Sequence, residues 1–221
     1  MAPHPATRPL NATNHGREEL SALPRPTTAR GEATRRKLLA AAEAEFGENG
    51  FAATAVSDIT RRAGVAQGTF YLYFPTKADA LRQLVQDMGR QLRHTLTAGT
   101  AGAKDRLEVE RRGLEAFIDF ALAHQNLYKV VMESQFVDDS IYREYYQTLA
   151  DSYAVNLRRA QERGELRDLD AGAQAWALMG AAHFLGLRYA IWERRRPPQH
   201  VLDATFEVLA RGIAPMRDAA G

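Results

Sequence analysis

The chain has 221 residues, a mass of 24.6 kDa, 45% hydrophobic residues and a formal net charge of +2 at pH 7. This length suits one domain, or a small domain followed by a larger one, and the hydrophobic content is sufficient to fill a core. Because the sequence contains no cysteine, it excludes disulfides, thiolate metal ligands and a cysteine nucleophile, and nothing indicates an oxidising compartment.

The first 31 residues are expected to form a disordered arm. Residues 1 to 33 contain five of the nine prolines and little periodic apolar character, which does not favour a packed structure. The arm has no apolar run of the length found in signal peptides, so we expect a cytoplasmic protein.

A pair of short amphipathic helices is predicted at about residues 55–74. In the first, Val56, Ile59 and Ala63 recur at helical spacing and form one apolar stripe. Thr54 lies just before this helix, where its hydroxyl can cap free backbone N–H groups. Gly64 then ends the helix, because glycine tolerates the left-handed backbone that other residues avoid. Helix, glycine turn and helix together form a helix-turn-helix motif.

The second helix of the pair has a narrow apolar face and a broad polar one. Phe70 and Phe74 are four residues apart and fall on one side, so they can anchor the helix but cannot bury it. The other side is neutral and hydrogen-bonding. It comprises Gln67, Thr69, Tyr71 and Tyr73. A protruding helix of this kind fits the major groove of DNA, where base edges present distinct donor and acceptor patterns.

Eight residues of this segment are candidates for contacts with double-stranded DNA. A glutamine can pair with an adenine edge, hydroxyls can reach bases or phosphates, a glycine allows close approach, and a lysine supplies a cation. The candidates are Thr54, Ser57, Gln67, Gly68, Thr69, Tyr71, Tyr73 and Lys77. Short helix pairs are common and tyrosine-rich stretches often lie in a core or an interface, so the spacing alone leaves a purely structural role open.

The segment from Thr34 to about Leu84 resembles the DNA-binding domain of the TetR (tetracycline repressor) family of bacterial transcription regulators. The matching positions are Arg36, Leu38, Leu39, Ala42, Phe46, Gly50, Thr54, Ile59, Ala63, Gly64, Val65, Gly68, Thr69, Tyr71, Tyr73, Phe74, Lys77 and Leu81. Two positions depart from the family pattern: Thr60 replaces an alanine, and Ala66 replaces a serine that caps the second helix. Loss of that cap costs about 1 kcal/mol. The resemblance implies a DNA-binding domain over residues 32–92.

Beyond Leu84 the sequence predicts helices throughout and no strand. Helical periodicity extends over residues 76–99, 104–123, 125–134, 138–163, 170–194 and 198–213, with glycine, Asp-Asp or Pro-Pro at the boundaries. We therefore expect an all-α protein of about nine helices, with a three-helix N-terminal domain and a C-terminal helical bundle over residues 93–221.

The most apolar segment, Ala175 to Leu187, is expected to be a buried helix rather than a membrane span. It is shorter than the roughly twenty residues needed to cross a bilayer, and it contains His183. In the TetR family the last two helices of the bundle form the dimer interface, so the resemblance implies a homodimer through about 171–194 and 198–213. Such a dimer presents two reading helices to a near-palindromic operator.

The C-terminal domain of this family usually holds an effector pocket, so the resemblance implies a hydrophobic or aromatic small-molecule ligand. The side chains expected to line it are Phe120, Tyr128, Met132, Phe136, Tyr153, Trp176, His183 and Arg188. Each aromatic residue alone is more typical of a core, and a satisfied core histidine is the commoner role for His183. Arg158, Arg159 and Arg163 suit the phosphates of an acyl-coenzyme A thioester, although a solvated helix end explains them as well.

We expect a DNA-binding transcription regulator rather than an enzyme. The sequence has no nucleophile elbow, phosphate-cradling glycine loop, H-E-x-x-H motif or closely spaced carboxylate and histidine ligands, so no catalytic residue, cofactor or metal is predicted. The resemblance implies a homodimeric repressor that a ligand releases from its operator. The alternatives are a helical ligand-binding or interaction module, or an enzyme assembled from distant residues.

Overall fold

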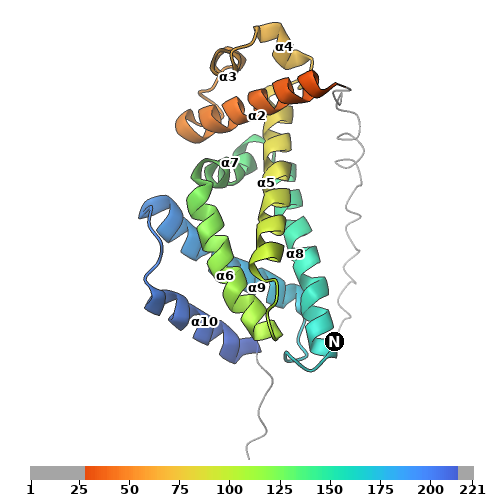
Figure 1. The fold of residues 1–221 in the computed structure, drawn as a ribbon, viewed down its shortest axis with the longest axis vertical. Coiled ribbons are helices and arrows are strands. Elements are labelled where there is room, and N and C mark those ends of the chain that lie inside the picture. The colour runs from red at the N-terminus through yellow and green to blue at the C-terminus, as the bar shows by residue number, and fades with distance from the viewer. Residues whose placement is uncertain (1–27, 214–221) are drawn as a thin grey trace, which may run out of the picture.

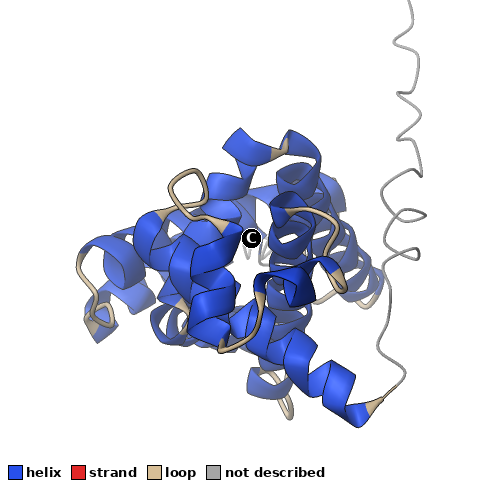
Figure 2. Cartoon of the chain, turned by 90° about the horizontal axis from the view of Figure 1, so that it is seen from above, coloured by secondary structure: helices blue, strands red, loops and turns tan. Residues whose placement is uncertain are grey.

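The fold is helical throughout the part of the chain that the structure, a computed structural model, describes: residues 28–213 (Figure 1). The helices are α2 (Ala29–Asn49), α3 (Val56–Ala63), α4 (Gln67–Tyr71), α5 (Lys77–Gly99), α6 (Arg106–Ala123), α7 (Gln125–Val137), α8 (Asp139–Glu162), α9 (Ala171–Gly186) and α10 (Gln199–Ile213). A π-helix, Leu187–Trp192, continues α9. Figure 2 shows only helices and loops among the described residues, which confirms the predicted all-α class.

Helix α2 begins earlier than the sequence suggested. Thr28 is its N-cap, and the Thr28 hydroxyl accepts a hydrogen bond from the backbone N–H of Gly31 at 3.1 Å. The prediction of an arm through residue 31 is therefore wrong at its C-terminal end, because residues 29–31 are helical. The rest of the predicted arm lies outside the described residues.

The helix-turn-helix pair packs on α2 through the apolar faces predicted for it. The side chains of Ile59, Phe70 and Phe74 are completely buried. Gly64 ends α3 in the left-handed conformation, with a φ angle of 69°. The short α4 therefore leaves its polar side exposed at the end of the molecule opposite α10 (Figure 1).

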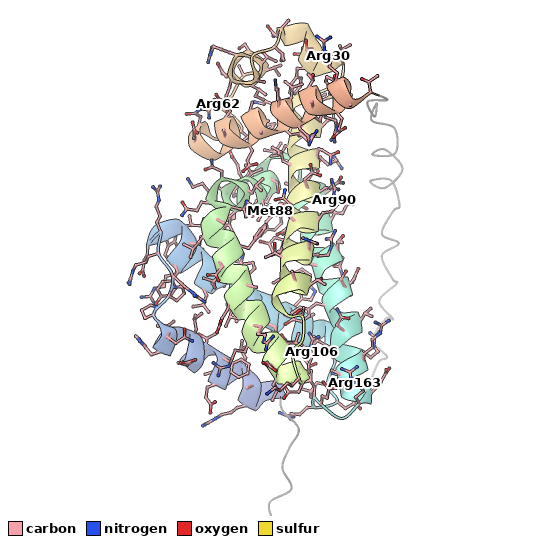
Figure 3. The ribbon with its side chains drawn as sticks, viewed as in Figure 1. Arg30, Arg62, Met88, Arg90, Arg106 and Arg163 are labelled. Atoms are coloured by element: carbon pink, nitrogen blue, oxygen red, sulfur yellow. The ribbon has the colours of Figure 1, made fainter. Side chains whose placement is uncertain are left out.

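An ion-pair cluster fixes α3 on α2. The Arg62 guanidinium lies 2.7 Å from a carboxylate oxygen of Glu45 and 2.6 Å from one of Glu48, both on α2. Figure 3 labels Arg62 beside α2. These hydrogen-bonded carboxylates raise the pKa of Arg62 further above its usual value. The orientation of α3 relative to α2 thus depends on both packing and paired charge.

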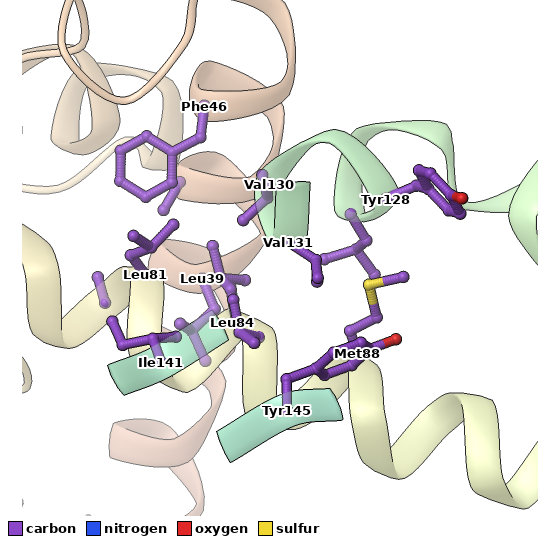
Figure 4. Close-up of a cluster of buried hydrophobic side chains, with 14 of the residues drawn as sticks. Leu39, Phe46, Leu81, Leu84, Met88, Tyr128, Val130, Val131, Ile141 and Tyr145 are labelled. Carbon is purple, nitrogen blue, oxygen red and sulfur yellow. The ribbon is translucent and has the colours of Figure 1, made fainter. Parts of the chain in front are cut away.

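Helix α5 connects the N-terminal helices with the bundle. The Thr76 hydroxyl caps it by accepting from the backbone N–H of Asp79 at 3.2 Å. Its buried residues include Leu81, Leu84 and Met88, which belong to one apolar cluster that continues through α2, α7 and α8 (Figure 4). The domain boundary predicted between residues 92 and 93 falls inside this helix, so no linker separates the two parts.

The bundle helices agree with the predicted ranges to within a few residues. Helix α7 extends to Val137, beyond the predicted end at residue 134. The predicted helix 170–194 changes character after Gly186, where the π-helix follows and the N–H of Glu193 donates to the carbonyl of Arg188, five residues back, at 2.9 Å.

Helix α9 is buried on one side only, so the expectation of a buried helix is met in part. Ala175 and Leu178 are buried, whereas Trp176 and Phe184 are 47% and 69% exposed. Among residues 28–213, no helix has both the length and the apolar character needed to cross a membrane.

Candidate DNA-binding surface and ligand cavity

The outer side of α3 and α4 exposes four of the eight residues predicted to contact DNA. Ser57, Gln67, Gly68 and Tyr71 are exposed, and we call these four residues the reading surface. Thr69 is partly buried. Apart from Gly68 itself, its two chain neighbours and the nearby backbone of its own helix, no atom of the described chain lies within 4 Å of the position that a Cβ on Gly68 would take. The reading surface therefore has open space in which a DNA backbone can approach.

Tyr73 lies at the edge of this surface and is partly buried. Its side chain packs against the apolar core, and its ring centroid is 6.5 Å from that of Phe74. Ala66, at the N-cap of α4, makes no side-chain capping bond, as the sequence predicted. The start of the reading helix is accordingly stabilised by its packing rather than by a cap.

Thr54 does not play the part predicted from the sequence. Its side chain is buried, and the hydroxyl donates to the carbonyls of Gly50 at 2.8 Å and Glu45 at 3.2 Å. Ala55 is the N-cap of α3 instead, and the Asp58 carboxylate accepts from its backbone N–H at 2.9 Å. Thr54 therefore secures the loop between α2 and α3 and has no free hydroxyl for a phosphate.

Lys77 also has a different role from the predicted phosphate contact. Its ammonium donates to the carbonyls of Phe51 at 2.6 Å and Thr54 at 2.7 Å, and it lies 4.2 Å from the centroid of the Phe51 ring. Partial burial lowers the pKa of this ammonium. Within the described chain, Lys77 thus holds the α2–α3 loop against the start of α5.

Sequence reasoning missed one cation beside the reading surface. The Arg61 side chain is 74% exposed at the end of α3, and its guanidinium pairs with Asp58 at 2.6 Å. Its position three residues before Gly64, in the last turn of the predicted helix, is a signal that the sequence did contain. Arg36 and Lys37 are exposed on α2, as expected of a cationic run.

The bundle encloses a cavity of about 460 Å³, which we call the main cavity. Its walls come from α5, α6, α7, α8, α9 and α10 and are mostly apolar. The apolar side chains include Met88, Leu92, Leu96, Val109, Leu114, Phe117, Val131, Leu149, Leu178, Met179, Ala182, Phe206 and Leu209. Its size falls in the range of small-molecule pockets.

A neutral hydrogen-bonded group lies on the wall of the main cavity. The Tyr128 hydroxyl lies 2.9 Å from Nδ1 of His183 and donates to the His183 carbonyl at 2.8 Å. The Tyr146 hydroxyl lies 3.2 Å from the same ring nitrogen. Burial lowers the pKa of His183 and raises the pKa of both tyrosines, so all three are uncharged at neutral pH.

A buried charge cluster lies at another part of the cavity wall. Arg106 Nη2 lies 2.5 Å from Glu110 Oε1, and the two side chains are only 11% and 7% exposed. The Tyr153 hydroxyl donates to the other carboxylate oxygen of Glu110. Burial and the Glu110 carboxylate raise the pKa of Tyr153. These three groups satisfy one another. In Figure 3, Arg106 lies near the end of the bundle farthest from α3 and α4.

Of the eight residues predicted to contact a ligand, Tyr128, Tyr153 and His183 lie on the cavity wall, and their part in binding stays a prediction. The expectation is wrong for the other five in the described fold. Phe120 and Met132 pack in the apolar core, whereas Phe136 is 83% exposed and Trp176 also faces outward. Arg188 is exposed and pairs with Glu193 at 2.9 Å.

Helical periodicity marked these residues as apolar or amphipathic, but it could not tell which side of each helix faces the cavity. The cavity-facing residues Leu92 and Leu96 of α5 were missed for the same reason. Arg158, Arg159 and Arg163 lie away from the cavity wall, and Arg163 is paired with Glu165.

Residues 38–84 match the family model described as bacterial regulatory proteins, tetR family. The tetR-family match covers this segment and not the bundle that follows it. A curated relative, the uncharacterized HTH-type transcriptional regulator YdgC of Bacillus subtilis, is 38% identical over 65 residues, which are 29% of this chain and 33% of the relative. The chain therefore spans about a third of that relative's length.

Two solved structures of regulators named FadR have the same fold as this chain. The fatty acid degradation regulator FadR from Bacillus halodurans has a TM-score of 0.72 and 19% identity, and the match covers 84% of this chain and 96% of that one. The transcriptional regulator FadR from Bacillus subtilis, solved with stearoyl-CoA, has a TM-score of 0.70 and 21% identity, with coverages of 80% and 98%.

Proposed function

We propose that this chain is a DNA-binding transcription regulator without catalytic activity, a homodimeric repressor that leaves a palindromic operator when an apolar small molecule binds the main cavity. The reading surface on α4, within a tetR-family domain, carries this proposal. Gln67 and Tyr71 are exposed donors and acceptors on a protruding helix, which is the arrangement that reads base edges and phosphates in the major groove.

A second copy of the chain is the proposed partner of the outer side of α9 and α10. Phe184 on α9 is 69% exposed and Val208 on α10 is 73% exposed, which is unusual for large apolar side chains. Apart from the nearby residues of α9 itself, nothing in the described chain lies within 4 Å of the place that a Cβ on Gly180 would occupy, so a helix of a second copy can approach α9 closely. A two-fold dimer through these helices would present two reading surfaces.

Phe184→Arg is expected to convert the dimer into a monomer, because it places a charge in the apolar centre of the proposed interface. The oligomeric state can be measured by analytical ultracentrifugation at micromolar concentration. Phe136→Arg is the matched control. Phe136 is also an exposed phenylalanine, but it lies on α7, outside the proposed interface. A monomeric wild type, or a Phe184→Arg protein that remains dimeric, would contradict the assignment.

A long-chain acyl-coenzyme A thioester is the proposed ligand class. The main cavity has apolar walls suited to a chain, and its Tyr128, Tyr146 and His183 group can hydrogen-bond a thioester carbonyl after rearrangement. The structurally similar regulator from Bacillus subtilis was solved with stearoyl-CoA, which supports this class over aromatic ligands.

The proposed signal passes from α7 to the loop between α2 and α3. Tyr128 of the cavity wall is on α7, and so is Glu133, whose carboxylate accepts from the backbone N–H of Phe51 at 2.8 Å. Phe51 is also held by Lys77 through its carbonyl. A ligand that shifts α7 therefore acts on the segment that supports α3, in addition to any movement of α5.

The test of this function is a gel-shift assay on DNA beside the chain's own gene, with and without palmitoyl-CoA. We expect a specific complex whose affinity falls about 5- to 150-fold with the ligand, the range of a typical allosteric coupling. Coenzyme A without an acyl chain is the control. Failure to bind any DNA would favour the helical module or enzyme. A ligand that binds the cavity and leaves operator affinity unchanged would rule out ligand-controlled repression.

A further inference from the structure

A second depression lies between α5 and α8, two of the helices that also line the main cavity. It has a volume of about 250 Å³ and lies between the first part of α5 and the first part of α8; we call it the α5–α8 groove. Its lining residues are Arg82, Val85, Gln86, Gly89, Arg90, Arg93, Ile141, Glu144, Tyr145 and Thr148. Arg93 and Tyr145 line both this groove and the main cavity.

The main cavity reaches the surface along the same helix pair, just beyond Arg93. Thr97, one turn after Arg93 on α5, lines the cavity and is exposed, as are Ser152 and Asn156 on α8. A molecule that leaves the cavity at this mouth therefore meets the groove on one side. The groove and the cavity can hold two ends of one ligand.

The groove is cationic, and one of its three arginines has no matching carboxylate. Arg82 lies 2.7 Å from Asp138, and Arg90, which projects from α5 in Figure 3, pairs with Asp87. Across residues 28–213, no carboxylate lies within ion-pair distance of the Arg93 guanidinium, and no carbonyl accepts from it. Glu144, on α8, is the carboxylate that lines the groove itself.

Gly89 explains why the Arg93 guanidinium can lie at the junction. A Cβ at residue 89 would be 3.4 Å from Nη1 of Arg93 and 3.5 Å from the ring of Tyr145, so the absent side chain leaves room for both. The Tyr145 ring is buried and contacts the apolar cluster with Met88 on its inner side (Figure 4). Arg93 therefore places a positive charge without a carboxylate partner at the junction between the apolar wall of the main cavity and the polar α5–α8 groove.

We propose that the α5–α8 groove binds the phosphate-bearing head of the ligand whose apolar chain fills the main cavity, with Arg93 as the residue that recognises the phosphate. The proposal rests on the proposed function only for the chain's place in the cavity. Arginine suits this task because its planar guanidinium forms charge-assisted, bidentate hydrogen bonds with phosphate.

Other cations near the mouth are less suited to this task. Arg106 is paired with Glu110 through Nε and Nη2, so its charge is already matched by a carboxylate. Arg159 is exposed and falls seven residues after Ser152, so it lies on the same side of α8 but beyond the mouth and outside both linings. It offers a matched control for the effect of removing one arginine beside the mouth.

The experiment measures direct binding of palmitoyl-CoA, palmitate and 1-hexadecanol to the full chain by calorimetry, without DNA. Arg93→Ala is expected to weaken palmitoyl-CoA binding about 10- to 100-fold, the loss of a charge-assisted hydrogen bond, and to leave hexadecanol binding unchanged. Palmitate should lose less than palmitoyl-CoA. Arg159→Ala should bind all three ligands as the wild type does, and higher salt should reduce only the contribution of Arg93.

A second variant tests the sign of the charge. Glu144→Gln removes the opposing carboxylate and should tighten palmitoyl-CoA binding by about two- to fivefold. Equal losses for hexadecanol and palmitoyl-CoA in Arg93→Ala would overturn the proposal, as would a loss in Arg159→Ala instead. Equal losses for palmitate and palmitoyl-CoA would overturn the assignment of a phosphate. Because the calorimetry contains no DNA, it tests the role of Arg93 even if the ligand does not release the operator. Likewise, the gel-shift assay tests operator release even if Arg93 does not bind the phosphate.

Discussion

Phe70→Ala is expected to unfold the DNA-binding helices at physiological temperature and to abolish operator binding. The ring is completely buried and packs against Phe74 with a centroid separation of 5.4 Å. Truncating a buried phenylalanine costs about 3–5 kcal/mol through lost burial and the remaining cavity. That loss is comparable to the whole stability of many small domains. Chemical denaturation followed by circular dichroism measures it.

Tyr71→Ala is the matched control, because residue 71 is the next one on the same short helix but its side chain is 52% exposed. It should leave the free energy of unfolding within about 0.5 kcal/mol of the wild type. Operator affinity should nevertheless fall about tenfold or more, since a hydrogen bond to a charged phosphate is lost. If both variants bind DNA normally, α4 does not read DNA. If both variants lose the same free energy of unfolding, the Tyr71 side chain is not exposed as described.

Arg106→Ala is the second substitution with a large expected effect, a loss of about 3–5 kcal/mol in the free energy of unfolding. The variant leaves the Glu110 carboxylate buried without its cation, and removing one partner of a buried ion pair is costly for this reason. The cation also lies 5.6 Å from the centroid of the Tyr153 ring, an interaction that disappears with it. Urea denaturation with and without the substitution measures the loss.

Arg143→Ala is the control for this prediction. Arg143 forms a pair with Asp139 at the same spacing of four residues, but the two side chains are 79% and 58% exposed. An exposed pair contributes about 0–1 kcal/mol, because water already solvates both charges. Similar losses in the free energy of unfolding would mean that burial does not make the Arg106–Glu110 pair more important for stability than the exposed pair.

Most of the fold could be predicted from the sequence because its signals are local. The spacing of Phe70 and Phe74 predicts which side of α4 is buried, and Gly64 marks the end of α3 by its backbone alone. Helix ranges in the bundle follow from periodicity and from the glycine, Asp-Asp and Pro-Pro boundaries between the helices. The dense motif match over the first helices identified the family.

The site was less predictable because its residues depend on contacts between distant segments. Lys77 has the charge and the sequence position expected of a phosphate-binding residue. In the fold, however, its ammonium donates to carbonyls of the α2–α3 loop. Thr54 caps no helix because its hydroxyl turns back toward α2. Arg93 and Arg106 look alike in sequence, and only the fold pairs one of them with a buried carboxylate.

The uninterrupted apolar cluster from α2 to α8 limits how freely this reading domain can be exchanged. Phe46 on α2, Leu84 on α5 and Val130 on α7 belong to a single apolar core (Figure 4). Separating the N-terminal helices from the bundle would therefore expose apolar side chains on both. A chimera that joins α2–α4 to an unrelated bundle would expose the inner side of α2. Giving this chain a different DNA specificity therefore means replacing residues on the outer side of α4 and leaving α2 in place.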